Sequence, residues 1–232
     1  MPRDIEAVIS HEARSEEIEI QRRNALQETS SLPVERTTAV KRNSRNMVLA
    51  QNGRHQIMVI DDHQTLAAHK DDMKQSAKVI SNMAKTAGGN GMDLYRASPG
   101  ARRPHTCKTG LQIEEAISEM HSVGGTCNMV NCLKNVLDKV LVRSGVKPTS
   151  IYIYTDGVWN TEARDVARVI CEAMEYLSKH GQPSSTLLFQ FIQFGNSVKA
   201  TQQLASLKGR CMLPFGNEQW NIVDVNHCQA YS

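Results

Sequence analysis

The 232-residue sequence has no apolar run long enough to cross a bilayer, and its six cysteines include no CxxC pair. A membrane-spanning helix needs roughly 18 consecutive apolar residues, so we expect no membrane association. The cysteine spacing favours buried reduced thiols over a disulfide framework or a zinc site. Residues 1–20 are charged and lack the apolar block of about 7 to 15 residues that marks a secretory signal. We therefore expect a cytoplasmic protein.

Aromatic residues make up only 5% of the chain, and the formal net charge is only +3. Positive side chains gather between residues 36 and 54 and again between 102 and 108, but no aromatic residue is interleaved with them. A nucleic-acid groove combines a basic track with stacking aromatics. We therefore interpret the first cluster, which includes Arg54, as a solvated linker and the second as a solvated loop. The composition argues against nucleic-acid binding.

The first 50 residues differ in character from the rest of the chain. Residues 4–28 contain neither Gly nor Pro and suit an exposed helix, whereas residues 29–46 are polar and typical of a linker. We predict a helical extension and linker over residues 1–50. One compact domain is then expected over residues 51–232, a length that suits a single core.

Within this domain, strand patterns alternate with helix patterns. The predicted strands are 57–60, 92–97, 150–157, 186–195 and 220–225, and the predicted helices lie before residue 85 and at 111–120, 129–141, 166–177 and 198–207. The apolar run 186–195 is too continuous for a strand with a wet face, so the sheet should be covered on both sides. The alternation predicts the α/β class, with a doubly wound, mostly parallel sheet and helices on both faces.

Two of the predicted strands end in an acid, Asp61 and Asp156. Ligands of doubly wound sheets bind at the carboxyl ends of the strands, near the point where strand order reverses. Oxygen donors at such a place suit Mg²⁺, which prefers about six oxygen ligands. Thr126, which follows two glycines, would add a hydroxyl ligand or would simply cap the next helix. Both roles stay open.

Three segments carry a family resemblance: IDDHQTL (60–66), GGT (124–126) and YTDG (154–157). Together they resemble the metal-contacting segments of a von Willebrand factor type A (vWA) domain, in particular the intracellular versions found in multidomain fungal proteins. The resemblance covers residues 54–232. It implies a Rossmann-like three-layer sandwich and a non-enzymatic protein-protein interaction module, with the partner bound at the carboxyl-end face of the sheet.

The resemblance also implies a metal-ion-dependent adhesion site (MIDAS) that holds Mg²⁺ or Mn²⁺. Its ligand positions correspond to Asp61, His63, Thr65, Thr126 and Asp156. His63 departs from the family, which has a serine there, and imidazole is a poor ligand for Mg²⁺ but a good one for zinc. We therefore expect a degenerate, MIDAS-like site in which the metal can be absent.

Three further residues are candidates for contact with a protein partner. Asp62 falls at the variable second place of the first segment, and Trp159 and Asn160 follow the third segment. An amphipathic aromatic residue at such a place would anchor a partner. Packing of Trp159 against its own domain is the alternative.

Two other functions are alternatives. A receiver domain of two-component signalling also opens with an acid pair, and it would use Asp93 as phosphoacceptor, but Asp93 follows Asp61 too closely for the two βα units required. A metal-dependent hydrolase would use Asp61, His63 and Asp156, but nothing in the sequence marks a general base. The His105–Cys107 segment lacks a positioned third partner for nucleophilic catalysis. The sequence thus favours a non-enzymatic module.

Overall fold

The structure is a computed structural model that describes residues 53–86, 91–98, 104–120, 127–142, 146–215 and 218–228. The helical extension and linker predicted for residues 1–50 lie outside these ranges, and so does Thr126. None of the helices in the described ranges has the length and apolar character that a bilayer crossing demands.

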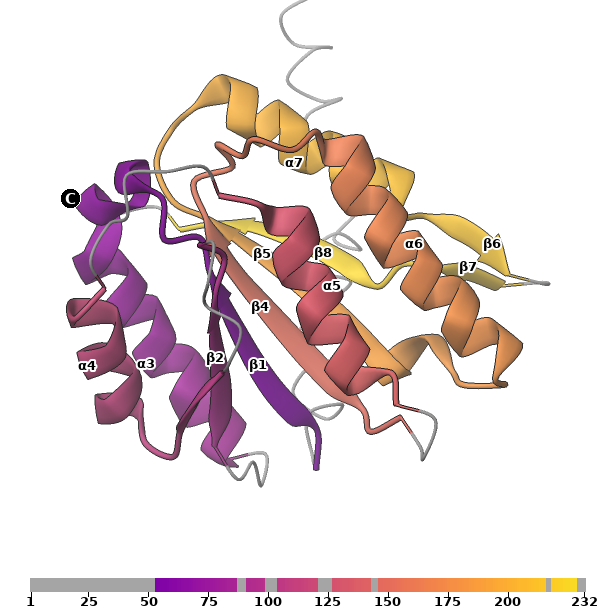
Figure 1. Ribbon diagram of the computed structural model, residues 1–232, viewed down its shortest axis with the longest axis horizontal. Helices are drawn as coiled ribbons and strands as arrows, with labels where there is room; N and C mark the ends of the chain where they lie inside the picture. The colour runs from indigo at the N-terminus through magenta and orange to yellow at the C-terminus, as the bar shows by residue number, and fades with distance from the viewer. Residues whose placement is uncertain are drawn as a thin grey trace, which may run out of the picture. The chain divides into compact units, whose positions relative to one another are not determined.

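A twisted six-stranded sheet forms the centre of the described domain (Figure 1). Its strands are β1 (His55–Ile60), β2 (Met92–Arg96), β3 (His105–Cys107), β4 (Thr149–Thr155), β5 (Leu187–Gln193) and β8 (Val223–His227). Their order is β3-β2-β1-β4-β5-β8, and every pairing is parallel except that of β3 with β2. The chain places β2 and β3 on one side of β1 and β4, β5 and β8 on the other. Strand order therefore reverses between β1 and β4.

Helices cover both faces of the sheet (Figure 1). One face carries α5 (Met129–Val140), α6 (Ala163–Lys179) and α7 (Val198–Arg210), and the other carries α3 (Lys70–Thr86) and α4 (Gly110–Ser118). Two short 3-10 helices, η1 (Gln64–His69) and η2 (Ser184–Thr186), and a small hairpin of β6 (Leu213–Phe215) and β7 (Glu218–Trp220) complete the described elements. The α/β class and the doubly wound sheet predicted from the sequence are confirmed.

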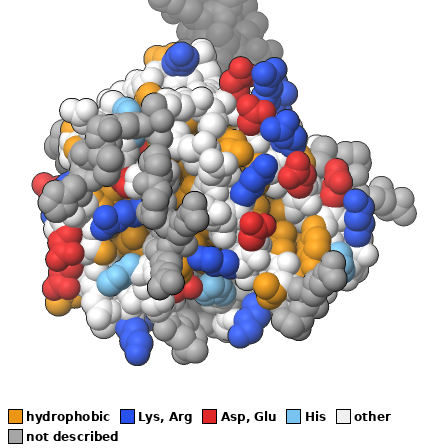
Figure 2. Space-filling model, viewed as in Figure 1, with side chains coloured by type: hydrophobic (Ala, Val, Ile, Leu, Met, Phe, Trp, Pro, Cys, Tyr) orange, Lys and Arg blue, Asp and Glu red, His pale blue; other side chains and the backbone are white. Residues whose placement is uncertain are grey.

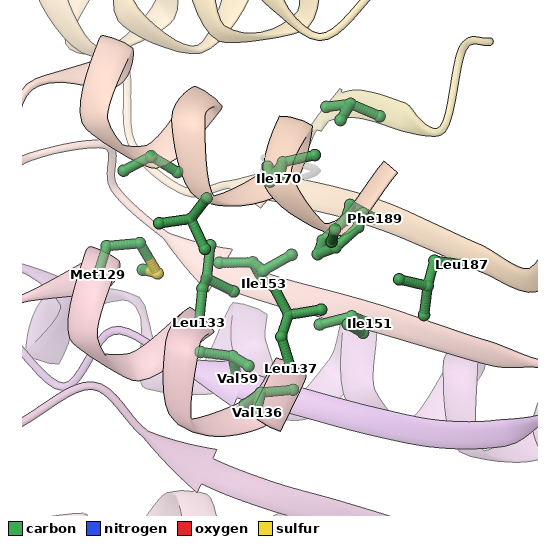
Figure 3. Packing of buried hydrophobic residues seen from close by; sticks show 14 of the residues in the cluster. Val59, Met129, Leu133, Val136, Leu137, Ile151, Ile153, Ile170, Leu187 and Phe189 are labelled. Atoms are coloured by element: carbon green, nitrogen blue, oxygen red, sulfur yellow. The ribbon is translucent and has the colours of Figure 1, made fainter. Parts of the chain in front are cut away.

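The period-two pattern of β1 explains why the sheet is buried on both sides. Successive side chains of a strand point to opposite faces. Ile57 and Val59 accordingly pack into the core under α5 and α6, while Met58 and Ile60 pack into the core under α3. Figure 3 shows the first core, in which Leu133 of α5 lies beside Val59 and Ile153. Truncation of a buried leucine of this kind typically costs about 2 to 5 kcal/mol of stability.

The three-residue strands β3, β6 and β7 were not predicted. His105–Cys107, considered above only as a His/Cys pair, is the antiparallel edge strand β3. The predicted strand 220–225 is divided, because Trp220 ends β7 and the sheet strand β8 begins at Val223. The predicted two-sided burial of the 186–195 strand is also incomplete, since Leu188 and Gln190 of β5 are only half-buried. Strands of three residues are too short to show an alternating pattern.

The interpretation of Arg54 as part of a solvated linker was wrong. Its side chain is only 5% exposed and lies at the amino-terminal edge of the sheet. It donates to the hydroxyl of Ser150 at 3.0 Å and to the backbone carbonyls of Thr149, Ser185 and Thr186. The guanidinium therefore joins the beginnings of β1, β4 and β5. Its five donors in a rigid plane suit such a role.

Candidate functional site

Asp61 and Asp156 lie at the same edge of the sheet. The strands β1 and β4 are paired with Ile60 opposite Tyr154, and the N–H of Asp61 donates to the carbonyl of Tyr154 at 2.9 Å. Asp61 therefore follows β1 at the level where β4 ends at Thr155 and is followed by Asp156. This is the point where strand order reverses, which is where doubly wound folds bind ligands. The two acids thus converge as the sequence predicts.

Thr155 connects the two segments that carry these acids. Its hydroxyl donates to Oδ2 of Asp61 at 2.7 Å and accepts from the N–H of Gly157 at 2.9 Å and from Nε1 of Trp159 at 2.8 Å. A threonine hydroxyl has one proton to donate and two lone pairs. All of its hydrogen-bonding capacity is therefore used, and the Thr155 side chain is fully buried.

The carboxylate of Asp61 is fully buried beneath this edge. Burial raises its pKa to about 6, because the charged form loses its hydration, and the nearby charge of Asp156 acts in the same direction. Hydrogen bonds from Thr155, from the thiol of Cys127 and from the N–H of His63 oppose this increase. Both oxygens of Asp61 are thus engaged by protein donors.

His63 and Thr65 are used locally, at the start of η1. His63 is the N-cap of this helix, and its Nδ1 accepts from the N–H of Thr65 at 3.4 Å and lies 2.8 Å from the Thr65 hydroxyl. The imidazole therefore satisfies a free backbone donor of the first helical turn, a task more commonly given to Ser, Thr, Asp or Asn. Thr65 is exposed, and His63 is half-buried.

The segment after β4 forms a tight turn against α7. Oδ1 of Asp156 accepts from the N–H of Val158 at 2.8 Å, and Gly157 has φ +78°. A Cβ at Gly157 would lie 2.7 Å from the Cβ of Ala200, which no pair of real side chains tolerates. The turn can approach α7 this closely only because residue 157 is glycine. The first turn of α7 is thereby positioned beside the site.

Trp159 and Asn160 behave differently from each other. The Trp159 indole is half-buried, packs on Phe191 with a ring-centroid distance of 6.0 Å, and uses its N–H on Thr155. Asn160 is exposed, and its backbone N–H reaches the carbonyl of Cys127 at 3.4 Å. Trp159 therefore holds the turn onto the core, while the side chain of Asn160 points toward solvent. Asp62 is only 4% exposed.

Two contacts bring the loop after β5 into the same region. A Cβ at Gly195 would lie 3.1 Å from Nε2 of His69 in η1, and the rings of His69 and Phe194 are 6.4 Å apart. Val158 is 46% exposed and Val198, at the start of α7, is 70% exposed. We call the exposed side chains of these three loops, Thr65, Val158, Asn160 and Val198, the carboxyl-edge rim.

Several of the side chains predicted as metal ligands accept hydrogen bonds from groups within the protein. Asp61 uses both oxygens, Asp156 uses Oδ1 and His63 uses Nδ1 in hydrogen bonds within the protein. Mg²⁺ requires near-ideal octahedral oxygen geometry at about 2.0 to 2.1 Å. Among the residues that the structure describes, no three His, Cys, Asp or Glu side chains are grouped closely enough to hold a metal ion.

Two buried residues of the site were missed in the sequence. Thr155 sits inside an apolar strand, where a threonine gives no sign of the three groups that it contacts. Cys127 was expected only to be a buried reduced thiol, yet it precedes α5 and donates to Asp61. Burial and the adjacent Asp61 charge raise the pKa of this thiol far above its ordinary value, so it stays protonated as a donor.

The position of Asp93 disagrees with a receiver domain. Asp93 is the second residue of β2, near the amino-terminal edge of the sheet and therefore opposite the site. Its Oδ2 lies 2.9 Å from Nε2 of His55, and its Oδ1 accepts from the hydroxyl of Thr106 at 2.6 Å. A phosphoacceptor needs a free carboxylate oxygen beside the other acids. Asp93 instead joins β1, β2 and β3.

The described surface shows no sign of a nucleic-acid track on the face drawn in Figure 2. Basic and acidic side chains are interspersed there, and no continuous basic stripe crosses the visible described residues. A nucleic-acid site would gather basic charge along one groove. This surface pattern agrees with the small net charge of the sequence.

Several solved structures are similar to this chain in fold. No family model and no curated protein matches the sequence. Similar solved structures include proximal thread matrix protein 1 from the mussel byssus (19% identity, 76% of this chain and 45% of that one, TM-score 0.48) and the SpRpn10 VWA domain (10%, 75% and 87%, 0.48). A third is the pilus adhesin SpaC from Lactobacillus rhamnosus GG (11%, 74% and 28%, 0.48).

The chain thus spans less than half of the mussel protein and about a quarter of the adhesin. These matches include a structure that is named a VWA domain. At such identities and TM-scores, they transfer no residue role to this chain.

Proposed function

We propose that this chain is a non-enzymatic protein-interaction module of the vWA type, whose partner binds over the carboxyl-edge rim. The observation that carries the proposal is the Thr155 network, which holds the segments after β1 and β4 rigidly together beneath exposed side chains. A surface that is fixed before binding loses little conformational entropy when a partner docks. Loops on a rigid scaffold are where binding residues concentrate.

The chemistry of the rim suits a partner with an apolar contact. Val158 and Val198 belong to neighbouring segments, since Gly157 contacts Ala200, and both valines are substantially exposed. Burying each of them against a partner would contribute about 1.5 to 3 kcal/mol at most. Asn160 and Thr65 supply hydrogen-bonding groups beside them. Asp62 and Asp156 are buried and adjoin these segments in sequence, so their negative charge would favour a neutral or basic contact over an acidic one.

We also propose that the module works without a bound metal ion. The supporting observation is that protein donors already occupy the oxygens of Asp61 and the Nδ1 of His63. The test is a thermal unfolding series with Mg²⁺, Mn²⁺ and Zn²⁺. An ion that binds only the folded chain adds about 2.7 kcal/mol of stability at a hundredfold excess over its Kd, which is readily measured. We expect no change, and an increase with Mg²⁺ or Mn²⁺ would contradict metal independence.

His63→Ser tests whether the imidazole of His63, and not the hydrogen-bonded oxygens of Asp61, prevents Mg²⁺ binding. Serine also caps a helix start, so η1 should persist while a hydroxyl replaces the ring. If His63 is what prevents Mg²⁺ binding, only this variant will show a higher midpoint of thermal unfolding with Mg²⁺. If neither chain responds, the engaged oxygens of Asp61 are the more important obstacle.

The interaction itself is tested with charge substitutions in the rim. Val158→Asp and Val198→Asp place a carboxylate in the proposed contact, and Val79→Asp is the matched control, because Val79 is 56% exposed on α3, away from the loops of the rim. Each chain is used as bait, and bound proteins are quantified by mass spectrometry. We expect a partner that is retained by the wild type and by Val79→Asp but lost by both rim variants. Equal capture by all four baits would argue against the rim.

A further inference from the structure

A groove lies between α4 and the strands β2 and β3. It is lined in part by two buried apolar residues, Leu94 of β2 and Ala116 of α4. Its volume is about 440 Å³, within the range of roughly 300 to 1,000 Å³ that small-molecule sites occupy. A second cavity, beside Ser81 and Gly91, has about 10 Å³, which is room for one water molecule at most. The groove shares no residue with the carboxyl-edge rim.

The sheet side of the groove carries nitrogen donors. Arg96 follows Leu94 by two residues, and His105 is paired with Leu94 between β2 and β3, so the three side chains point to the same face of the sheet. Arg96 is half-buried and His105 is exposed. Among the described residues, no side-chain hydrogen bond or ion pair involves either of them. The planar guanidinium of Arg96 is therefore available to bind a carboxylate through two parallel hydrogen bonds.

The helix side of the groove carries carboxylates. Glu115 lies in α4, and Glu119 is the C-cap residue of this helix, four positions further on. Residues at this spacing are neighbours on a helix surface, and two like charges there repel each other. Within the described ranges, the Glu115 carboxylate is paired neither with Arg96 nor with another side chain. An ammonium group, which has three N–H donors, would offset the repulsion between the two glutamates.

The helix that forms this side is held at both ends. At its start, Thr109 and Gln112 form a capping box, in which each side chain accepts from the backbone N–H of the other residue. At its end, the ammonium group of Lys70 in α3 donates to the backbone carbonyls of Ser118 and Met120. The groove therefore has its shape before a ligand arrives, and binding would cost little conformational entropy.

We propose that this groove binds a free amino acid as its zwitterion, with the carboxylate on Arg96 and the ammonium group on Glu115 and Glu119. An anion alone would be repelled by the two glutamates, and a cation alone would be repelled by Arg96, so the groove disfavours ligands of a single charge. One carbon joins the two ionic groups of an amino acid, which lets them bridge side chains that are not themselves paired. The side chain of the ligand then lies over Leu94 and Ala116, which favours an apolar one.

The experiment titrates the isotope-labelled full-length chain with L-alanine, L-valine, L-leucine, L-methionine and L-phenylalanine and follows its backbone amides by nuclear magnetic resonance. For at least one of them we expect chemical-shift changes concentrated at Leu94, His105 and Ala116, with a Kd below about 1 mM. The N-acetyl derivative of that amino acid lacks the ammonium group, and its amide lacks the carboxylate. Each should bind about tenfold more weakly or worse, because one charged contact is lost. Equal affinity for all three compounds would contradict recognition of the zwitterion.

Substitutions assign the two charges. Arg96→Gln and Glu115→Gln should each raise the Kd about tenfold or more, whereas Arg168→Gln, which removes an exposed arginine of α6, should bind like the wild type. The inference is wrong if none of the five amino acids shifts the amides of the groove at about 10 mM. It is equally wrong if Arg96→Gln binds as tightly as the wild type. Should Arg96→Gln unfold, the comparison of the amino acid with its two derivatives decides the outcome on the wild-type chain.

Discussion

Thr155 donates its hydroxyl proton to the carboxylate of Asp61 at 2.7 Å, and this hydrogen bond joins the ends of β1 and β4. The same hydroxyl receives the indole N–H of Trp159. One side chain therefore fixes an acid, an aromatic ring and the turn between them. This contact connects the two segments that carry the proposed binding edge.

Replacing Thr155 by valine keeps the shape of the side chain but removes its hydroxyl. Asp61, Gly157 and Trp159 each lose a hydrogen-bond partner, and a buried polar group without a partner costs about 1 to 3 kcal/mol. We expect Thr155→Val to lower the free energy of unfolding in urea by about 2 to 4 kcal/mol. Thr155→Ser, which keeps the hydroxyl and loses a methyl group, should lose only about 1 kcal/mol. Equal losses in both variants would show that the network contributes little.

The stability of the domain should depend on pH through Asp61. Its pKa is raised from 3.8 in the unfolded chain to about 6 in the folded one, so the folded chain holds this proton more tightly. The corresponding stabilisation is complete below pH 3.8 and is lost as the pH rises through 6. A pKa difference of about two corresponds to about 2 to 3 kcal/mol.

The comparison variant for this effect is Asp61→Asn, which cannot titrate. We expect the free energy of unfolding of the wild type, minus that of Asp61→Asn, to decrease by about 2 to 3 kcal/mol between pH 4 and pH 7. Urea unfolding at several pH values measures it. A constant difference would mean that folding leaves the pKa of Asp61 unchanged, and a difference that increases with pH would mean that the folded chain stabilises the charged carboxylate.

Gly157 and Gly181 test the contact between the site and α7. Both have positive φ, +78° and +65°, but only Gly157 faces another residue, Ala200. Gly181→Ala should cost about 1 to 2 kcal/mol from backbone conformation alone. Gly157→Ala should cost about 1 to 3 kcal/mol more, because the new methyl group overlaps Ala200.

Adding Ala200→Gly to Gly157→Ala removes the overlapping methyl group and should restore part of the lost stability. The same substitution in the wild type should instead cost about 1 kcal/mol, because glycine weakens a helix. A double-mutant cycle from thermal or urea unfolding measures the coupling. Additive effects would show that the turn at Gly157 and helix α7 are not energetically coupled.

Arg54→Met should be strongly destabilising although it removes a buried charge. The three carbonyls and the Ser150 hydroxyl that Arg54 joins would lose their donor, at about 1 to 3 kcal/mol for each group left without a partner. Relief of guanidinium desolvation, which lowers the Arg54 pKa, offsets part of this loss. We expect a net loss of about 2 to 4 kcal/mol.

The control for Arg54 is Arg168→Met. The Arg168 side chain is 62% exposed and pairs with Asp165 at 3.2 Å. An exposed ion pair contributes about 0 to 1 kcal/mol, so this variant should unfold nearly like the wild type. If the two substitutions have similar effects in urea, the buried position of Arg54 is unimportant to the fold.

The fold could be predicted because burial on both sides leaves a clear mark in the sequence. The run Ile57–Ile60 is apolar at every position, and the stripe that includes Leu133 and Leu137 repeats with helical period. The edge strand β3 left no such mark, because its first two residues are exposed and it has only three. Arg54 was misassigned because an isolated charge in a polar stretch looks solvated until the strands that surround it are assembled.

The acids of the candidate site could be predicted from the sequence, but the hydrogen bonds between its residues could not. Asp61 and Asp156 stand out because each ends an apolar strand. That the Thr155 hydroxyl donates to Asp61 depends on the register of β1 with β4, which no spacing in one sequence reveals. The metal and partner-binding roles of Thr126, Asp62 and Asn160 stay predictions.

Arg54 secures three strands at the end of the sheet opposite the rim. We therefore expect that the loops of the rim can be exchanged while Arg54 keeps the strands in register at the opposite end of the sheet. Because the rim and Arg54 lie at opposite ends of the sheet, the domain is a practical scaffold for engineering. Libraries varied at Thr65, Val158, Asn160 and Val198 would sample new recognition surfaces on an unchanged fold.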